Sequence, residues 1–186
     1  MFEQIKETLK QTLSSYRYNH SLNVVEEATK LAIFYQANVN KCQLCALTHD
    51  LAKEFSEEEN KAYIKKYNLS KDLLKEENKN LIHGYIAAII VKEKYNFSSD
   101  MVNAIKYHTT GYPSIDLLAK IIYLADKIEK GKNYPGIEEE RLLAYQDLDK
   151  AIICCLNNQI KKLTKDNQKI NKLAYETKEY LEKELS

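Results

Sequence analysis

One stretch, Leu47-Thr48-His49-Asp50-Leu51-Ala52-Lys53, constrains the fold of this chain more than any other. It lies inside a pattern from Asn40 to Phe55 that predicts a helix with an apolar side, which would hold His49 and Asp50 near the core. An adjacent His-Asp pair offers a nitrogen and an anionic oxygen to one metal ion. Because Lys53 follows at helical spacing, all three side chains can point the same way. The stretch therefore indicates a metal that acts on an anionic substrate.

The patterns on both sides of this stretch are helical as well. The 186 residues include only four glycines and two prolines, and the alternating pattern of strands is nearly absent. The sequence therefore predicts an all-α fold. Helices are expected at about residues 2–13, 16–37, 40–55, 57–68, 81–95, 99–108, 117–128, 138–145 and 149–163, with a short helix in segment 69–80.

Length and composition indicate a single domain over residues 1–186, with a core of about residues 16–163 and a charged C-terminal helix at about 168–185. The 28 Lys and Arg residues are balanced by 27 Asp and Glu residues, so the chain lacks the basic excess typical of nucleic-acid binding. No apolar run approaches the roughly 18 residues of a membrane span, and Met1 leads into a charged helix instead of a signal peptide. We therefore expect a cytoplasmic protein that binds neither nucleic acid nor membrane. The oligomeric state stays open, with a homodimer as one option.

The cysteines fall inside helical patterns, at Cys42, Cys45, Cys154 and Cys155. This placement is typical of reduced core residues in an intracellular protein. The spacing of Cys42 and Cys45 also occurs in zinc and redox sites. A zinc site would need a second cysteine pair at suitable spacing, and a redox site would need a strand before Cys42, and the sequence shows neither. We interpret these residues as core packing.

The chain has four histidines, and each lies within or at the end of an apolar helical pattern: His20, His49, His83 and His108. Asp126 likewise interrupts an apolar run at residues 121–125, where an unpaired carboxylate would cost several kcal/mol to bury. A single histidine on an apolar face is most often a hydrogen-bonded core residue. Four histidines together with Asp50 and Asp126 favour a metal centre.

The order of these residues resembles that of the HD-domain metal-dependent phosphohydrolase superfamily. The resemblance extends to its bacterial YqeK-type branch, the symmetrical bis(5'-nucleosyl)-tetraphosphatases, which hydrolyse diadenosine tetraphosphate to two ADP. It implies an HD-domain multi-helix bundle with the metal site in its centre, and hydrolysis by metal-activated water. It covers the chain from Arg17 to about Asp149. The motifs that carry it are Arg17-Tyr18-Asn19-His20, His49-Asp50-Leu51-Ala52-Lys53, Leu81-Ile82-His83, Tyr107-His108-Thr109-Thr110-Gly111, Tyr123-Leu124-Ala125-Asp126 and Tyr134-Pro135-Gly136.

The resemblance implies roles for individual residues. The expected metal ligands are His20, His49, Asp50 and Asp126. His83 and His108 either bind a second metal, with Asp50 as a bridge, or contact the phosphates, and both options stay open. Iron is the implied metal, and manganese also suits mixed nitrogen and oxygen ligands. The expected catalytic residues are His49, Asp50 and Lys53. The expected substrate-binding residues are Arg17, Lys53, His83, His108, Thr109, Thr110 and Lys132.

The chain departs from the family pattern at two positions suited to phosphate binding. Tyr112 and Lys132 stand where the family usually has arginine, and lysine cannot reproduce the planar fork of a guanidinium. Ala87 replaces a usual glycine, a change of one small residue for another. The choice of substrate is therefore less constrained than the metal chemistry.

Two other functions are compatible with the same residues. A phosphohydrolase of this superfamily could act on another nucleotide, such as a nucleoside monophosphate, a nucleoside triphosphate or a cyclic dinucleotide. A non-catalytic helical module that binds nucleotides is the other alternative, although Arg17 and Lys53 beside a complete set of ligands favour an enzyme.

Overall fold

The computed structural model describes residues 1–75 and 78–185, so that Glu76, Glu77 and Ser186 lie outside the described part of the chain. The described residues form helices and no strand, which confirms the predicted all-α fold. The short helix expected in segment 69–80 is a 3-10 helix, η1, although residues 76 and 77 of that segment are not among those described. The α-helices are α1 (Phe2–Thr12), α2 (Ser15–Phe34), α3 (Val39–Thr48), α4 (Glu57–Lys66), α5 (Ile82–Tyr95), α6 (Ser99–Lys106), α7 (Leu117–Ile128), α8 (Ile137–Ala144), α9 (Leu148–Lys165) and α10 (Lys172–Glu184), with η1 at Lys71–Leu74.

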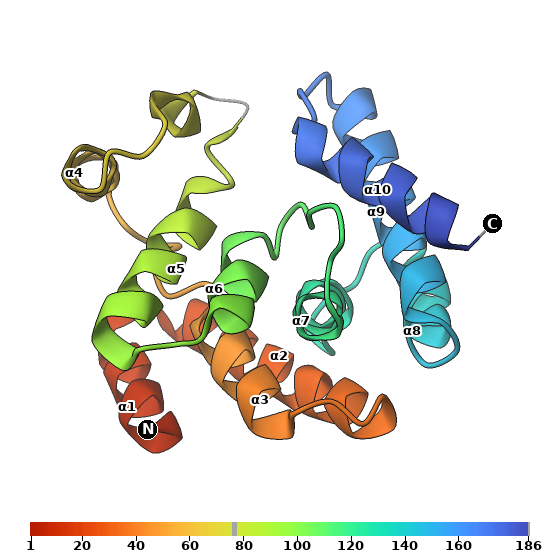
Figure 1. Cartoon of the computed structure of the whole chain (residues 1–186), viewed down its shortest axis with the longest axis horizontal. Helices are drawn as coiled ribbons and strands as arrows, with labels where there is room; N and C mark the ends of the chain where they lie inside the picture. The colour runs from red at the N-terminus through yellow and green to blue at the C-terminus, as the bar shows by residue number, and fades with distance from the viewer. Residues whose placement is uncertain (76–77, 186) are drawn as a thin grey trace.

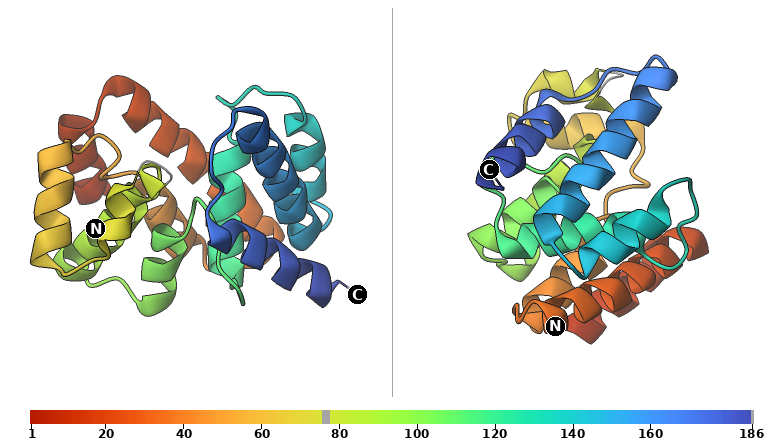
Figure 2. Two further views of the ribbon diagram at one scale, coloured as in Figure 1. Left: turned by 90° about the horizontal axis from the view of Figure 1, so that it is seen from above. Right: turned by 90° about the vertical axis from the view of Figure 1, so that its right-hand side faces the viewer.

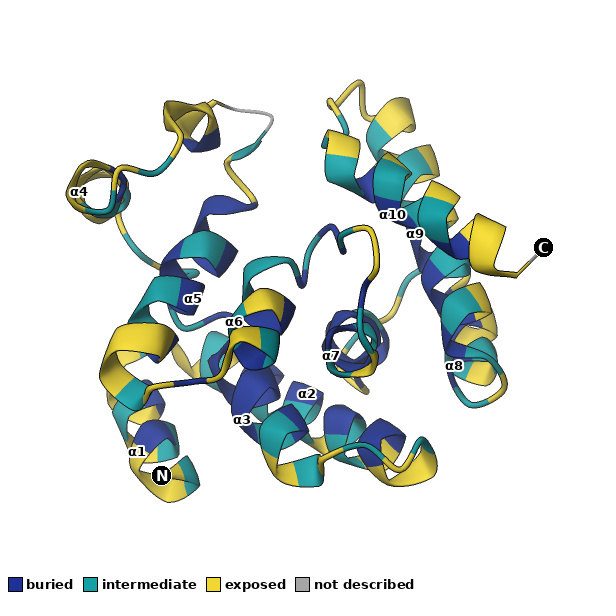
Figure 3. Ribbon diagram, in the orientation of Figure 1, coloured by how far each residue is buried: buried dark blue, intermediate teal, exposed yellow. Residues whose placement is uncertain are grey.

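Helix α7 lies in the middle of the bundle (Figure 1). It packs against α2, α3 and α6 on one side and against α8 and α9 on the other, and Figure 2 shows these two groups of helices from further directions. Residues 121–125 of α7 are fully buried, and the helix is dark blue nearly all round in Figure 3. A helix that is apolar on all sides belongs in a core. Its position carries Asp126, the next residue, into the centre of the protein.

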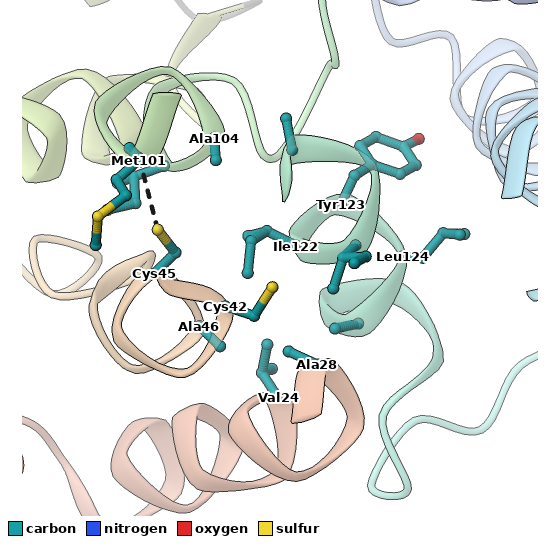
Figure 4. Close-up of a cluster of buried hydrophobic side chains, with 14 of the residues drawn as sticks. Val24, Ala28, Cys42, Cys45, Ala46, Met101, Ala104, Ile122, Tyr123 and Leu124 are labelled. Atoms are coloured by element: carbon teal, nitrogen blue, oxygen red, sulfur yellow. Dashed lines mark hydrogen bonds between the residues drawn. The ribbon is translucent and has the colours of Figure 1, made fainter. Parts of the chain in front are cut away.

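The core between α2, α3, α6 and α7 contains two of the cysteines (Figure 4). Cys42 and Cys45 are fully buried, and the Cys45 thiol donates a hydrogen bond to the carbonyl oxygen of Met101 at 3.8 Å. Burial raises the pKa of Cys42 to about 11, which keeps its thiol protonated. All four cysteines are free thiols; Cys42, Cys45 and Cys155 are buried as interpreted, whereas Cys154 is only partly buried and does not belong to the core.

The helix predicted to continue through Phe55 ends earlier, because α3 stops at Thr48 and residues 49–54 form turns. The cause is the His49 side chain, whose Nδ1 donates a hydrogen bond to the carbonyl oxygen of Ala46 at 2.7 Å. In a continuing helix this carbonyl would accept from the backbone N–H four residues later. The side chain takes the place of that donor and ends the helix.

The C-terminal helix α10 packs on α9 and reaches the loop that follows α6. Its Thr177 is fully buried, and the Thr177 hydroxyl lies 3.2 Å from the carbonyl oxygen of Thr110. The charged last helix therefore supports the loop after His108. The organisation of residues 1–186 as a single domain stays a prediction. Across the described residues, no helix combines the length and the apolar character needed to cross a membrane.

Candidate metal centre

Five parts of the fold bring the predicted metal ligands together. His20 lies in the first half of α2, His83 in the first turn of α5 and Asp126 in the last turn of α7. His49 and Asp50 follow the end of α3, and His108 follows the end of α6. None of the six residues is more than 8% exposed. Side chains that are far apart in the sequence thus converge in one buried cluster.

Asp50 is the centre of this cluster. Its Oδ2 lies 3.7 Å from Nε2 of His20 and 3.5 Å from Nε2 of His49. Its Oδ1 lies 3.0 Å from Nε2 of His83 and 3.7 Å from Nε2 of His108. The two oxygens of one carboxylate therefore face two different pairs of histidines.

Asp126 extends one side of the cluster, since its Oδ1 lies 3.1 Å from Nε2 of His20 and 3.7 Å from Nε2 of His49. Two sets of side chains with suitable spacing for a metal ion share Asp50. We call the set that faces Asp126 the first ligand group: His20, His49, Asp50 and Asp126. The set on the other side is the second ligand group: Asp50, His83 and His108.

Hydrogen bonds set the orientation of three imidazole rings. The Nδ1 atoms of His49 and His108 each lie 2.7 Å from the carbonyl oxygen three residues earlier in the chain. The Nδ1 atom of His20 lies 3.2 Å from Oε1 of Glu129. A carbonyl or carboxylate oxygen accepts and does not donate, so these Nδ1 atoms carry the proton. Their Nε2 atoms then present lone pairs to the centre of the cluster, as in the histidine ligands of metal sites.

The donor atoms fit a metal ion. The Nε2 atoms of His20 and His49 are buried and have no hydrogen-bond partner among the residues that the structure describes. A buried polar atom without a partner is unfavourable. A cation between these nitrogens and the carboxylates would satisfy both atoms, and mixed nitrogen and oxygen donors suit a divalent transition metal. The cluster could therefore hold a divalent metal.

The two carboxylates of the cluster stay ionised, which favours a bound cation. Burial lowers the pKa of His83 to about 3 and lowers that of His108, so both imidazoles are neutral. Burial alone would raise the pKa values of Asp50 and Asp126, but the nearby histidines and Lys127 outweigh it and keep both carboxylates ionised. Burial alone would lower the pKa of His49, but the charges of Asp50 and Asp126 outweigh burial and raise this pKa. Two buried carboxylates that stay ionised favour a cation between them, and His49 would give up any second proton when a metal binds.

Two of the predicted phosphate-binding residues lie at the edge of the cluster. Arg17 donates a hydrogen bond from Nη1 to Oδ2 of Asp50. Lys53 places Nζ 3.3 Å from Nδ1 of His83, and burial lowers its pKa. Although the helix expected to carry Lys53 has already ended, its side chain still reaches the second ligand group.

The other predicted substrate-binding residues differ in their availability. Thr110 is buried, and its hydroxyl donates a hydrogen bond to the carbonyl oxygen of Gly111 at 2.9 Å. This hydroxyl therefore stabilises the loop and does not face a substrate. Thr109 is only partly buried and is the more accessible of the two. Lys132, in the loop after α7, forms no hydrogen bond or ion pair with the six residues of the cluster, all of which the structure describes, and lines a cavity together with Lys127.

Two charged residues beside the cluster were not among the predicted site residues. Lys127 places Nζ 3.0 Å from Oδ2 of Asp126. Glu129 is 3% exposed, and its carboxylate contacts His20 through one oxygen and accepts the backbone N–H of Gly131 through the other. A Cβ atom at position 131 would lie 2.9 Å from this carboxylate, so a larger residue there would have to displace the Glu129 side chain. Lys127 follows Asp126 inside the most apolar helical run, which was a sequence signal for a buried ion pair, whereas no local pattern singled out Glu129.

We expect Glu129→Gln to weaken metal binding, because the neutral amide no longer polarises the His20 ring. Loss of such a supporting partner typically lowers metal affinity about 10- to 100-fold. Titration of the protein against a competing chelator measures this change, and circular dichroism checks that the helical fold is retained. Glu58→Gln, on an exposed face of α4, is the matched control. Equal metal affinity in both variants would contradict the role of Glu129.

Comparison with known proteins places the chain in a family. Residues 17–131 match the HD domain, a range that includes all six residues of the cluster. The chain is 39% identical over 163 residues to the symmetrical bis(5'-nucleosyl)-tetraphosphatase of Halalkalibacterium halodurans, covering 87% of each chain. It is 35% identical over 169 residues to the enzyme of the same name from Bacillus subtilis, covering 90% of each.

A solved structure agrees with this relationship. A protein from Clostridium acetobutylicum, described as a predicted HD superfamily hydrolase involved in NAD metabolism, superimposes with a TM-score of 0.92 at 33% sequence identity. The alignment covers 99% of the present chain and 98% of that protein. The matched range, the sequence identities and the shared fold agree, and the chain therefore belongs to the HD domain family.

Proposed function

We propose that this protein is a metal-dependent hydrolase that cleaves diadenosine tetraphosphate symmetrically into two molecules of ADP. The relatives from Halalkalibacterium halodurans and Bacillus subtilis are named for this kind of activity and align with most of the chain. The structural observation that supports the proposal most strongly is the position of Asp50, whose two oxygens face separate pairs of histidines. Such a carboxylate can bridge two metal ions, an arrangement common in phosphatases.

In this proposal the first ligand group would hold one divalent metal ion and the second ligand group would hold another, with Asp50 contributing to both. Iron is the proposed metal, with manganese as the alternative, because both accept mixed imidazole and carboxylate ligands. In the bound state a divalent metal supplies activated water near neutral pH and positive charge beside the phosphoryl oxygens. The proposed location is the cytoplasm.

The reaction joins the oxygen of water to one of the two central phosphorus atoms. The bond from that phosphorus to the oxygen between the two central atoms breaks. This bridging oxygen leaves as a terminal oxygen of one ADP, the water oxygen stays with the other ADP, and the protons of water pass to the products or to solvent. No second substrate or cofactor is consumed.

The residues of the chain have distinct tasks in this scheme. Arg17 contacts Asp50 and Lys53 contacts His83, so a phosphate chain bound across the centre would lie near both side chains. Hydrogen bonds donated by Nδ1 to backbone carbonyl oxygens hold His49 and His108 in one orientation, which keeps the cluster preorganised. The protein thus positions the phosphates and holds the ligands still while the bond is cleaved.

Analysis of metals and products tests this proposal. We expect purified protein to contain close to two divalent metal ions per chain and to convert diadenosine tetraphosphate to ADP alone. The same assay with ATP, AMP and a cyclic dinucleotide examines the alternative substrates, which should be cleaved far more slowly. Formation of ATP and AMP from diadenosine tetraphosphate would mean asymmetrical cleavage and would contradict the proposal.

A further inference from the structure

Two cavities open beside the candidate metal centre. The first, which we call the α5 pocket, has a volume of about 420 Å³, and the second, the lysine pocket, has a volume of about 670 Å³. Both volumes are typical of small-molecule sites. The lining of the α5 pocket includes Lys53, Phe55, Leu73, Leu74, Ile82 and His83. The lining of the lysine pocket includes Lys127, Lys132, Tyr134, Lys161, Lys162 and Lys165.

Each pocket adjoins a different ligand group. His83 lines the α5 pocket, and its Nε2 lies 3.0 Å from Oδ1 of Asp50 in the second ligand group. Lys127 lines the lysine pocket, and its Nζ lies 3.0 Å from Oδ2 of Asp126 beside the first ligand group. Because Asp50 belongs to both groups, the lining residues of the two pockets are linked through the contacts of one cluster.

The lysine pocket carries a concentrated positive charge. Five lysines line it, and none of the described residues in its lining is acidic. Lys127 is paired with Asp126, but within residues 1–75 and 78–185 no carboxylate lies at ion-pair distance from the side chains of the other four. Like charges around one cavity repel each other, and an anion inside it would remove that repulsion. A phosphate-bearing ligand has the right charge.

We propose that the two pockets hold the two halves of one dinucleoside tetraphosphate, an inference that rests on the proposed function. The lysine pocket binds one nucleoside diphosphate half, and the α5 pocket binds the other. A substrate cut at its midpoint has equal halves on both sides of the reacting phosphorus atoms, so it needs a subsite on each side of the metal centre. In the α5 pocket, Phe55 and the neighbouring leucines offer an apolar surface for a base, and Lys53 faces the phosphates.

This assignment makes the lysines of α9 specificity-determining residues. Lys161, Lys162 and Lys165 face the half of the substrate that a mononucleotide lacks. They should therefore favour a polyphosphate with a nucleoside at each end, while leaving the chemistry at the metal centre unchanged. We therefore expect the loss of these lysines to change KM for the substrate and the affinity for the product ADP.

Charge removal on α9 tests the assignment in the metal-loaded, full-length protein. The test variant combines Lys161→Ala, Lys162→Ala and Lys165→Ala, and alanine preserves the helix. The control combines Lys10→Ala, Lys65→Ala and Lys94→Ala, which changes the net charge equally at exposed positions outside both pockets. Steady-state kinetics with diadenosine tetraphosphate and calorimetric titration with ADP are measured for each protein. Lys162→Glu alone serves as a second test variant.

We expect the test variant to raise KM about 10- to 100-fold, as three lost charge contacts imply, with a much smaller change in kcat. Wild-type and control proteins should bind two ADP per chain, and the test variant should bind one. An unchanged KM, or two bound ADP in the test variant, would overturn the lysine pocket assignment. Wild-type protein that binds only one ADP would overturn it too. Failure of wild-type protein to cleave diadenosine tetraphosphate would instead refute the proposed function, and the ADP stoichiometry would still test the pockets.

Discussion

Asp50→Ala is expected to lower the turnover of diadenosine tetraphosphate by about 1,000-fold or more and to remove bound metal. The carboxylate of Asp50 is shared by both ligand groups, so its loss removes an oxygen donor from each at once. Metal ions typically contribute several kcal/mol of transition-state stabilisation, and each 1.4 kcal/mol or so is a tenfold change in rate. Elemental analysis and initial rates with added iron or manganese measure the two effects.

The helical fold should survive this substitution, because Asp50 lies in a turn and not within a helix. Circular dichroism checks that point. Asp50→Asn keeps the size of the side chain but not its charge, and it should show nearly the same loss. Asp166→Ala, at an exposed position after α9, should behave as wild type. Protein with Asp50→Ala that still holds its metal and turns over substrate would refute the proposed roles of the cluster.

Gly84→Val is expected to destabilise the protein and to reduce its activity together. A Cβ atom at position 84 would lie 2.8 Å from the backbone carbonyl oxygen of Lys106 and 3.5 Å from Cε1 of His108. Helix α5 must therefore move away from α6, which separates His83 from His108. Such overpacking costs about 1–3 kcal/mol of unfolding free energy, and a displacement of about 1 Å at a catalytic site can cost about 100-fold in rate.

Chemical denaturation and initial rates measure the two consequences of Gly84→Val. Lys94→Val places the same side chain at an exposed position of α5, where only the lower helix propensity of valine applies, about 0.6 kcal/mol. Gly84→Ala should fall between this control and Gly84→Val. If valine at position 84 left both stability and activity at the level of the control, α5 and α6 would not need their close approach.

Much of this architecture could be predicted because its signals are local. The periodicity of apolar residues indicates where each helix runs, and the lack of alternating patterns excludes a sheet. The ligand cluster could be suspected because Asp126 interrupts an apolar run and because each histidine lies in an apolar pattern. The structure brings all of these side chains into one buried cluster.

Other features depend on contacts that no local pattern encodes. Helix α3 ends early because the ring of His49 donates a hydrogen bond to a carbonyl oxygen of its own helix. The periodicity of apolar residues cannot predict such a hydrogen bond. Glu129 follows an apolar helix in the sequence, where an acidic residue is usually solvated, yet it is buried against His20. The lysine pocket needs α9 to lie beside the loop after α7, and only the tertiary fold brings Lys132 near Lys162.

The spread of the cluster along the chain has a consequence for biosynthesis. His20 belongs to the second helix and Asp126 to the seventh, so a ribosome must release most of the polypeptide before the first ligand group is complete. Shorter nascent chains would expose histidines without the carboxylate that faces them. We therefore expect metal to bind late in maturation, and cells starved of that metal to accumulate a fully synthesised but more easily unfolded precursor.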